Sequence, residues 1–158
     1  MGKRAVVITV SDGVSSGDRE DGSGDALETM LTGAGYEVER DLVPDESDEI
    51  GAALIRAAAT ADLVLTTGGT GFGVRDVTPE ATGQVLEREA PGLVLAMIAH
   101  GLESTPMAAL TRAKAGTVGN ALVVNLPGSP RGAVENLEAI LEVIPHALQL
   151  LQGDNRHH

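Results

Sequence analysis

The sequence predicts an α/β protein with a mainly parallel β-sheet that helices cover on both faces. Short apolar runs, typical of buried strands, alternate with segments whose apolar residues recur at helical spacing. Glycine-rich loops follow three predicted strands, and no repeat or heptad interrupts the alternation. The 158 residues suit one domain. We expect it to span residues 1–153, with a tail at 154–158 that ends in two histidines, as purification tags do.

The chain begins with a predicted strand, a long loop, a helix and a second strand. Residues 4–10 are rich in Val and Ile, which predicts a buried strand. Residues 11–25 are polar and glycine-rich and predict a loop longer than the roughly two to six residues usual in α/β units. One apolar face predicts a helix over 26–34 that ends at Gly35, and partial alternation predicts a strand at 36–43.

A second helix and a third strand follow. Residues 44–48 open the helix, whose predicted buried stripe consists of Ile50, Ala53, Leu54, Ala57 and Ala58. Residues 62–67 are apolar at their centre and predict a buried strand. The next helical segments are expected at 79–90, 91–103 and 105–112.

The last predicted elements are a strand at 121–126 and a helix that begins at Ser129. The buried face of this helix is predicted to hold Ala133, Leu137, Ile140, Leu141 and Ile144. In parallel sheets, ligands bind beyond the carboxyl ends of the strands. We therefore expect the loops at 11–25, 68–76 and 127–129, together with the helix start at 44–48, to gather at one edge of the sheet.

Composition excludes several classes of protein. The formal net charge of −12 argues against general nucleic-acid binding, and one Tyr and one Phe are too few aromatic residues for a base-stacking surface. Without cysteine, the chain forms no disulfide and no thiolate metal site. The first apolar run ends at Ser11-Asp12-Gly13, and the run at 93–99 is far below the ~20 residues of a membrane span. We expect a cytoplasmic protein with no membrane partner.

The segment 66–81, TTGGTGFGVRDVTPEA, carries the strongest chemical signal. Its glycines permit positive φ angles and close approach of the backbone to a ligand, and successive N–H groups can form an anion-binding nest. A tight strand-to-helix connection is the alternative. The segment lacks the Gly-Lys-Ser/Thr of a Walker loop, and the first strand is not followed by Gly-x-Gly-x-x-Gly. Capping alone would explain Thr78-Pro79-Glu80.

Several polar residues in the loops have both a structural and a functional interpretation. Arg75-Asp76 suits a site for phosphate and Mg²⁺, or is a solvated surface pair. Asp45 is either a helix cap or a carboxylate that faces the ligand edge, and Asp12 is either a turn former or part of that edge. Ser129 suits an N-cap, and the same helix start offers N–H groups to an anion.

A phosphate site in so acidic a chain needs local positive charge. Candidate cations are Arg19, Arg75, Arg112, Lys114 and Arg131. The acidic residues at 18–21 are most simply solvated, and His100 and His146, without partners at metal-ligand spacing, are interpreted as structural.

Four motifs in order resemble the MoaB/Mog family of molybdenum-cofactor biosynthesis proteins. They are Thr9-Val-Ser-Asp12 with the loop to Asp21, Val43-Pro-Asp-Glu46, residues 66–81 and Asn125-Leu-Pro-Gly-Ser-Pro130. The resemblance covers nearly the whole chain. It implies a three-layer αβα sandwich, usually in a homotrimer. It also implies transfer of AMP from Mg-ATP to the terminal phosphate of molybdopterin, with release of pyrophosphate.

The resemblance also implies roles for individual residues. Asp45 and Asp76 match the two aspartates essential to the family reaction. The pterin and phosphate pocket is matched by Ser11, Asp12, Gly69, Thr70, Gly71, Gly128 and Ser129.

The attacking phosphate is already largely dianionic at pH 7, because its second pKa is about 6. No general base is therefore needed, and we hypothesise that Asp45 and Asp76 position Mg²⁺. Glycine-loop amides would hold the pterin phosphate, while Arg75 or Arg131 would offset charge on ATP. The alternative is a MoaB-type molybdopterin-binding protein of the same fold without adenylyltransferase activity. A third interpretation, an unrelated nucleotide binder, is disfavoured by the missing dinucleotide fingerprint.

Overall fold

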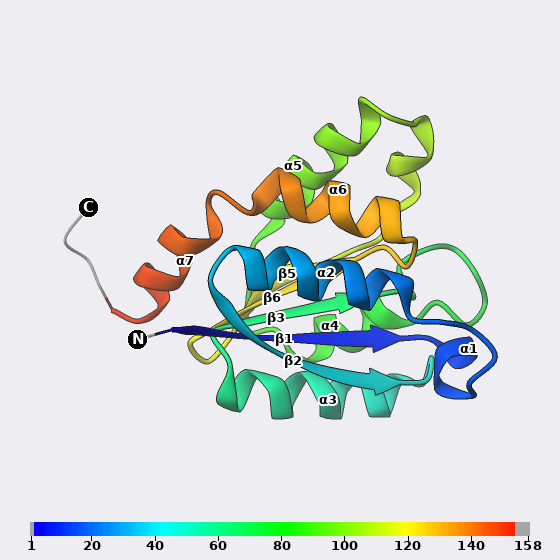
Figure 1. Cartoon of the computed structure of the whole chain (residues 1–158), viewed down its shortest axis with the longest axis horizontal. Coiled ribbons are helices and arrows are strands. Elements are labelled where there is room, and N and C mark those ends of the chain that lie inside the picture. The colour runs from blue at the N-terminus through cyan, green and yellow to red at the C-terminus, as the bar shows by residue number, and fades with distance from the viewer. Residues whose placement is uncertain (1, 154–158) are drawn as a thin grey trace.

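The computed structural model describes residues 2–153, and within them six strands form one sheet (Figure 1). The strands are β1 (Lys3–Val10), β2 (Tyr36–Val43), β3 (Leu63–Thr67), β4 (Arg88–Glu89), β5 (Ala115–Val118) and β6 (Ala121–Leu126). Their order is β2-β1-β3-β6-β5-β4. The first four in this order pair in parallel, while β5 and β4 add an antiparallel edge. The predicted mainly parallel sheet is confirmed.

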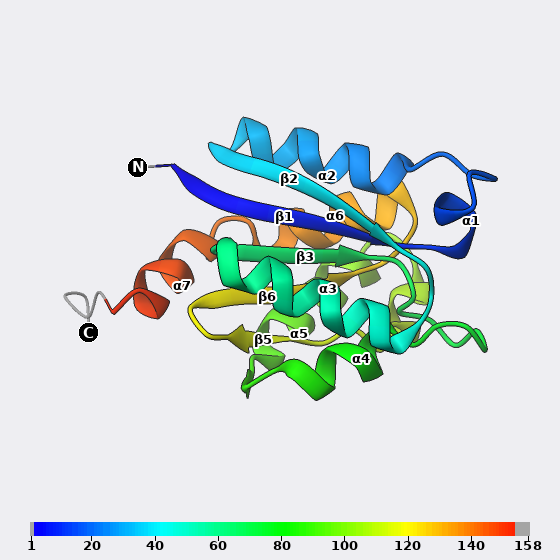
Figure 2. The same cartoon turned by 90° about the horizontal axis from the view of Figure 1, so that it is seen from below.

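Helices cover both faces, so the molecule has three layers (Figure 2). On one face lie α2 (Gly22–Gly33), α5 (Pro91–Leu102), α6 (Pro130–Ile140) and α7 (Ile144–Leu151). On the other lie α3 (Ser47–Thr60) and α4 (Thr78–Val85). A short helix α1 (Asp12–Ser15) follows β1, and the 3₁₀ helix η1 (Pro106–Leu110) follows α5.

Side chains alternate between the two faces of the sheet along the central strands, so they pack into two hydrophobic cores, one on each face. Val7 of β1 packs with Leu31 and Leu137 on the α2/α6 face, whereas Ile8 packs with Ile50 and Leu54 under α3. Successive side chains of a strand point to opposite faces, so a strand buried on both faces is a nearly continuous apolar run. Four of the five residues of the predicted stripe of α3, Ile50, Ala53, Leu54 and Ala57, are buried, and the fifth, Ala58, is partly buried.

Three elements differ from the sequence prediction. The predicted helix at 79–90 ends at Val85, and residues 88–89 instead pair with β5, a strand that the sequence did not predict. Gly116 lies at this pairing, where any Cβ would collide with the carbonyl oxygen of Arg88. The segment at 105–112 forms a 3₁₀ helix over Pro106–Leu110.

The predicted loop at 11–25 and the final helix also differ. Asp21 accepts a hydrogen bond from the N–H of Gly24, so α2 begins at Gly22, and α1 occupies the start of the loop. The final helix is divided at Leu141, and Pro145 lies in the first turn of its second part, α7. A proline is well accommodated in a first turn but interrupts a helix interior.

The direction in which successive strands are added to the sheet reverses between β1 and β3, and this position is called the topological switch point. The connection from β1 leads to β2 on one side, and the connection from β2 returns to β3 on the other. The two crossover helices, α2 and α3, consequently cover opposite faces (Figure 2). Ligands of open parallel sheets bind in the crevice outside the carboxyl ends of strands at this point. The loops that follow β1, β3 and β6 all begin at this edge.

None of the helices within residues 2–153 combines the length and the apolar character that crossing a membrane requires.

Candidate functional site

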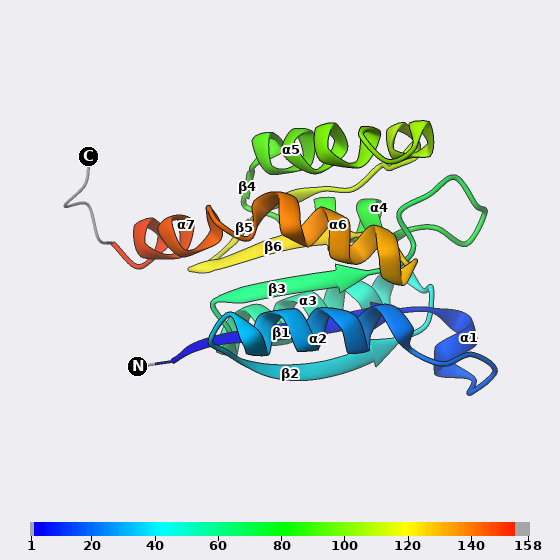
Figure 3. The ribbon, with the colours of Figure 1, turned by 45° about the horizontal axis from the view of Figure 1, so that its top comes forward.

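A polar cleft of about 740 Å³ lies at the switch point. Segments from four places in the chain form its walls: the end of β1 with α1 and the start of α2, the β2–α3 loop, the β3–α4 loop and the start of α6. Figure 3 shows the β3–α4 loop projecting beyond the sheet edge on the same side as α1. We call this cleft the polar pocket. Ser11, Asp45, Gly69, Asp76 and Ser129, all predicted site residues, line it.

Two hydrogen bonds between Asp12 and Asp45 join the end of β1 to the end of β2. The N–H of Asp12 donates to Oδ2 of Asp45 at 2.9 Å, and the N–H of Asp45 donates to Oδ1 of Asp12 at 3.0 Å. Asp45 does not cap α3, because Glu46 occupies the N-cap position and makes no side-chain cap bond. The cap interpretation of Asp45 is therefore wrong, and its carboxylate lies at the ligand edge.

The surroundings of Asp45 disfavour its negative charge. Burial raises the pKa of its carboxyl, and the charges of Asp12 and Asp76 raise that pKa further, against the lowering effect of the Asp12 N–H and of Arg75. Hydrogen bonds from Arg75 and then from the N–H of Asp45 lower the pKa of Asp12. Asp45 therefore lies beside two other carboxyl groups in a pocket that would favour an added positive charge.

The β3–α4 loop brings bare backbone to the polar pocket. Gly68 and Gly69 have φ angles of 107° and 72°, which only glycine adopts readily. A Cβ at Gly68 would collide with the carbonyl oxygen of Val10, and one at Gly69 with Oγ1 of Thr78. Within residues 2–153 the N–H groups of Gly69, Thr70 and Gly71 have no acceptor. This part of the loop is therefore free to bind an anion.

Arg75 is neutralised by two carboxylates. Its Nε and Nη2 donate to Asp12 at 3.0 and 3.2 Å, and Nη2 also donates to Glu46 at 3.0 Å. It makes no pair with its neighbour Asp76, whose Oδ2 instead accepts from the N–H of Gly73 at 2.9 Å. Arg75 and Asp76 therefore do not form the predicted surface pair with each other, although Arg75 is exposed to solvent. Arg75 links the ends of β1 and β2 to the β3–α4 loop.

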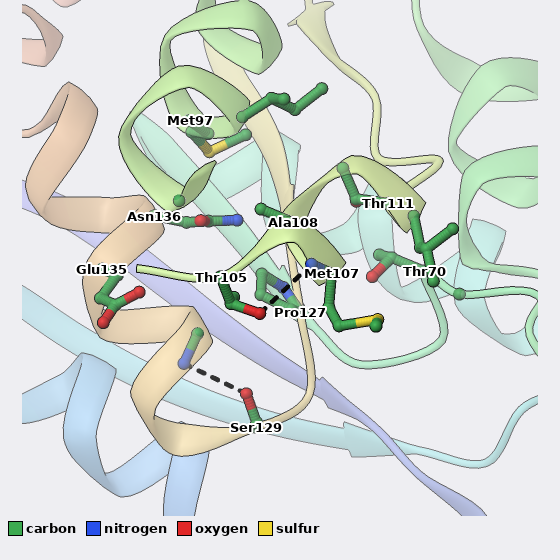
Figure 4. Close-up of a pocket in the computed structure, with 15 residues that line it drawn as sticks. Thr70, Met97, Thr105, Met107, Ala108, Thr111, Pro127, Ser129, Glu135 and Asn136 are labelled. Atoms are coloured by element: carbon green, nitrogen blue, oxygen red, sulfur yellow. Dashed lines mark hydrogen bonds between the residues drawn. The ribbon is translucent and has the colours of Figure 1, made fainter. Parts of the chain in front are cut away.

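A second, largely apolar pocket of about 270 Å³ adjoins the first (Figure 4). We call it the apolar pocket. Its walls come from α5, η1, the start of α6 and the β3–α4 loop, with the side chains of Met97, Ile98, Met107, Ala108 and Leu110 among them. Thr70 and Gly71 line this pocket, and Ser129 lines both. Ser129 also caps α6, since its Oγ accepts from the N–H of Gly132 at 3.1 Å.

A family match decides what kind of domain this is. Residues 6–146 match the family described as a probable molybdopterin binding domain. The chain belongs to this family. The two adjoining pockets are thus features of a molybdopterin-binding-domain fold.

Individual relatives agree with this assignment. The molybdenum cofactor synthesis protein cinnamon of Drosophila melanogaster is 41% identical over 152 residues, which cover 94% of this chain but only 25% of that protein. A molybdopterin adenylyltransferase of Helicobacter pylori is 39% identical over 153 residues, covering 94% of this chain and 87% of that enzyme. The crystal structure of the molybdopterin biosynthesis enzyme MoaB from Thermus thermophilus superposes with a TM-score of 0.90 at 49% identity, covering 96% and 97% of the two chains. The three-layer fold expected from the resemblance is confirmed.

In this molybdopterin-binding domain, the predicted cationic residues differ in their ion pairs and in whether they line a pocket. Arg131 lines neither pocket, and its Nε pairs with Glu135 at 3.0 Å along α6. Lys114 pairs with Glu89. Arg19 lines the polar pocket and makes no ion pair within the described part of the chain. Backbone N–H groups, rather than a cluster of cations, therefore supply most of the positive character at this edge.

Asp21 is a site residue that sequence reasoning missed. The sequence prediction treats it as solvated, yet it lines the polar pocket, caps α2, accepts from Oγ1 of Thr9 at 2.6 Å and pairs with Arg40 at 2.5 Å. An available signal was Asp-Gly-Ser-Gly directly before a helical apolar stripe, because Asp is a preferred N-cap. The polar pocket therefore has a more acidic rim than the sequence predicted.

Thr78 is predicted to cap α4, but Val77 occupies the N-cap position. Thr78 is fully buried, and its Oγ1 donates to the carbonyl oxygen of Gly68 at 2.9 Å. The side chain thereby holds the glycine loop to the start of α4.

The donor set suits Mg²⁺ with phosphate better than a metal held by protein alone. Within residues 2–153 no three His, Cys, Asp or Glu side chains are grouped as metal ligands. Asp45 and Asp76 each have one oxygen engaged by a backbone N–H, from Asp12 and Gly73, which leaves the other oxygen available. One or two carboxylates plus substrate phosphates is the usual coordination of Mg²⁺.

Proposed function

We propose that this chain transfers AMP from ATP to the terminal phosphate of molybdopterin and releases pyrophosphate. The observation that carries the proposal is the meeting of Asp45 and Asp76 with the free N–H groups of the glycine loop, beside an apolar pocket. The kinship with enzymes called molybdopterin adenylyltransferase supports it.

The reaction joins two anionic phosphates. An oxygen of the pterin phosphate attacks the α-phosphorus of ATP, a new P–O bond forms, and the bond to the β-phosphate oxygen breaks, so that pyrophosphate leaves with the electron pair. The nucleophile is largely ionised at pH 7 because its second pKa is about 6, so no side chain has to remove a proton. The protein has to align the groups and offset their repulsion.

Asp45 and Asp76 would hold Mg²⁺ through their available oxygens. When bound, Mg²⁺ supplies the positive charge that lets polyphosphate enter an acidic cleft. The N–H groups of Gly69, Thr70 and Gly71 would hold the pterin phosphate. The carboxylates thus position charge and do not act as bases.

The apolar pocket would hold the pterin rings. Flat heteroaromatic ligands favour a mostly apolar cavity with a few polar groups that fix their orientation. Asn136 lines this pocket and makes no hydrogen bond within the described residues, so its amide is free to bind the polar edge of a pterin. Thr70 and Gly71, which line the same pocket, connect this ring site to the phosphate site.

Anaerobic incubation with molybdopterin and Mg-ATP tests the proposal. Wild type should form adenylyl-molybdopterin and pyrophosphate. Asp76→Asn should lower turnover about a hundredfold or more while molybdopterin affinity survives. Asp48→Asn, at an exposed carboxylate in the first turn of α3, is the matched control and should keep full turnover. Retained turnover in Asp76→Asn would remove Asp76 from the mechanism.

A second test separates the two pockets. Asn136→Leu should weaken molybdopterin binding about tenfold and leave the KM for ATP unchanged. An equal loss for both substrates would contradict the assignment of the apolar pocket to the pterin.

A molybdopterin-binding protein without transferase activity is the second candidate. It is retained because the chain is 49% identical to a structure named MoaB and 39% identical to the Helicobacter pylori adenylyltransferase, so it resembles both named groups. Tight molybdopterin binding with no product under the same assay would select this candidate.

We further propose a cytoplasmic homotrimer in which residues 1–153 form the single domain. The family resemblance supports the trimer. Sedimentation equilibrium should give three times the 16.2 kDa chain mass, and a monomer would refute the trimer.

A further inference from the structure

Arg112 connects both ends of the loop that carries Asp76. It lies in the extended segment between η1 and β5, and its guanidinium donates from three nitrogens. Nε bonds the carbonyl oxygen of Gly71 at 2.8 Å, Nη2 bonds that of Asp76 at 2.7 Å, and Nη1 bonds Glu80 at 2.5 Å. One side chain therefore fixes the start of the loop, its end and the helix that follows.

Arg75, through Asp12 and Glu46, and Thr78, through the carbonyl oxygen of Gly68, hold other parts of this loop. Phe72 and Val74 at its tip are 72% and 97% exposed, so no apolar packing anchors the tip, although Val77 at the end of the loop packs against the core under α3. The guanidinium carbon of Arg112 lies 5.9 Å from the centre of the Phe72 ring, within the range of a cation–π contact. The backbone N–H of Arg112 also donates to the carbonyl oxygen of Thr70 at 2.9 Å. Arg112 thus adds the side-chain hydrogen bonds that hold the loop on either side of its exposed tip, at Gly71 and Asp76.

We propose that Arg112 is a positioning residue that holds Asp76 in its working place. The inference rests on the proposed function, in which Asp76 acts on the nucleotide. Arg112 itself does not line either pocket, whereas Asp76 lines the polar one. Its neighbours Leu110 and Thr111 line the apolar pocket, so the same segment joins the pterin side to the Asp76 loop.

The planar fork of arginine is essential to this geometry. It reaches two carbonyl oxygens and a carboxylate at fixed angles, whereas a lysine ammonium is a point charge on a flexible stem. Arg112→Lys keeps the charge and removes the fork. It therefore separates positioning from a simple electrostatic effect.

The test compares Arg112→Lys with Arg56→Lys, an ion-paired arginine on α3 that bonds only Asp41. Turnover, molybdopterin affinity and hydrogen exchange of the Gly73 amide are measured in the full chain. The Gly73 N–H donates to Oδ2 of Asp76, so its exchange rate reports the place of that carboxylate without any need for activity. Arg112→Lys should lower kcat about tenfold, speed Gly73 exchange about tenfold and leave molybdopterin affinity within about threefold. Arg56→Lys should change none of these.

Unchanged Gly73 exchange in Arg112→Lys would overturn the proposal, whatever happens to turnover. A loss of melting temperature with normal Gly73 exchange in the folded protein would indicate a merely structural role and would overturn it as well. If wild type forms no product, the adenylyltransferase function fails, and the exchange of Gly73 still decides whether Arg112 positions Asp76.

Discussion

Asp12 and Asp45 exchange backbone-to-carboxylate hydrogen bonds, each N–H donating to the other's side chain at 2.9 and 3.0 Å. The pair joins the chain directly after β1 to the chain directly after β2. It also leaves Oδ1 of Asp45 turned toward the glycine loop, where it lies 3.2 Å from the position that a Cβ of Gly69 would occupy. The bond that anchors Asp45 therefore also orients its second oxygen toward the polar pocket.

Asp45→Asn should strongly lower turnover without disrupting the fold. An asparagine oxygen still accepts from the N–H of Asp12, so the strand ends stay joined. The charge that would hold Mg²⁺ is lost, and turnover at a fixed Mg²⁺ concentration should fall about a hundredfold.

Steady-state assays across an Mg²⁺ titration, with circular dichroism of the variant, check this prediction. Glu49→Gln, an exposed acid on α3, is the control. Full activity of Asp45→Asn at the same Mg²⁺ concentration would contradict a role for Asp45 in holding the metal.

The same substitution should change how stability depends on pH. The pKa of Asp45 is raised by burial from its ordinary value of 3.8, so the folded chain binds this proton more tightly than the unfolded chain does. Folding stability therefore falls as pH rises through the window between the unfolded and folded pKa values, and the loss is complete above the folded pKa. Asparagine does not ionise, so at this position it does not lower folding stability as pH rises.

Asp45→Asn should consequently be more stable than wild type at neutral pH, and this advantage should vanish in acid. Urea unfolding at neutral and acidic pH, without Mg²⁺, measures the difference. An advantage that grows toward low pH would show that the sign is wrong.

Gly69→Ala should lose both stability and activity. Its φ of 72° lies in the left-handed region, which costs an L-residue about 1–2 kcal/mol, and the added Cβ would collide with Oγ1 of Thr78. We expect about 2 kcal/mol or more of destabilisation by urea unfolding.

Gly51→Ala is the matched control for this change. Gly51 lies inside α3, and its Cβ would meet only Cγ1 of Val85 at 3.9 Å. Alanine there should stabilise the protein by about 0.5–1 kcal/mol. Equal effects of the two substitutions would mean that the loop conformation is not fixed by Gly69.

The sequence predicts the polar pocket better than the rest of the site. Parallel strands bring their carboxyl ends to one edge, so the residues after β1, β2, β3 and β6 had to gather there. The apolar pocket is different, because its walls depend on how α5 and η1 pack beside α6, and no local pattern encodes that arrangement. The contact of Arg112 with Asp76 spans 36 positions and is equally invisible in local spacing.

The antiparallel edge of the sheet is equally hard to predict from local sequence patterns. β4 has two residues and β5 has four, so neither offers enough alternation to identify a strand. The pairing of β5 with β6 instead depends on the turn between them, where Gly119 has a φ of 59°.

Asn125 supplies the last prediction, because it is a buried amide that links the sheet to the site. Asn125 lies in β6 and is fully buried. Its Nδ2 donates to Oγ1 of Thr66 and to Oγ1 of Thr82, each at 2.9 Å. Its Oδ1 accepts from the N–H of Lys114 at 3.0 Å. Asn125→Ala would leave that N–H without its side-chain acceptor and open a cavity, so unfolding free energy should fall by about 2–3 kcal/mol. Asn120→Ala, at an exposed position in the turn before β6, should lower the unfolding free energy much less.

Asn125→Ala should also lower kcat. Thr82 belongs to α4 and Thr66 to β3, the two elements that flank the Asp76 loop, so loss of their shared hydrogen-bond donor should disturb the position of that loop. Unchanged turnover in the folded variant would show that the Asn125 amide only stabilises the fold.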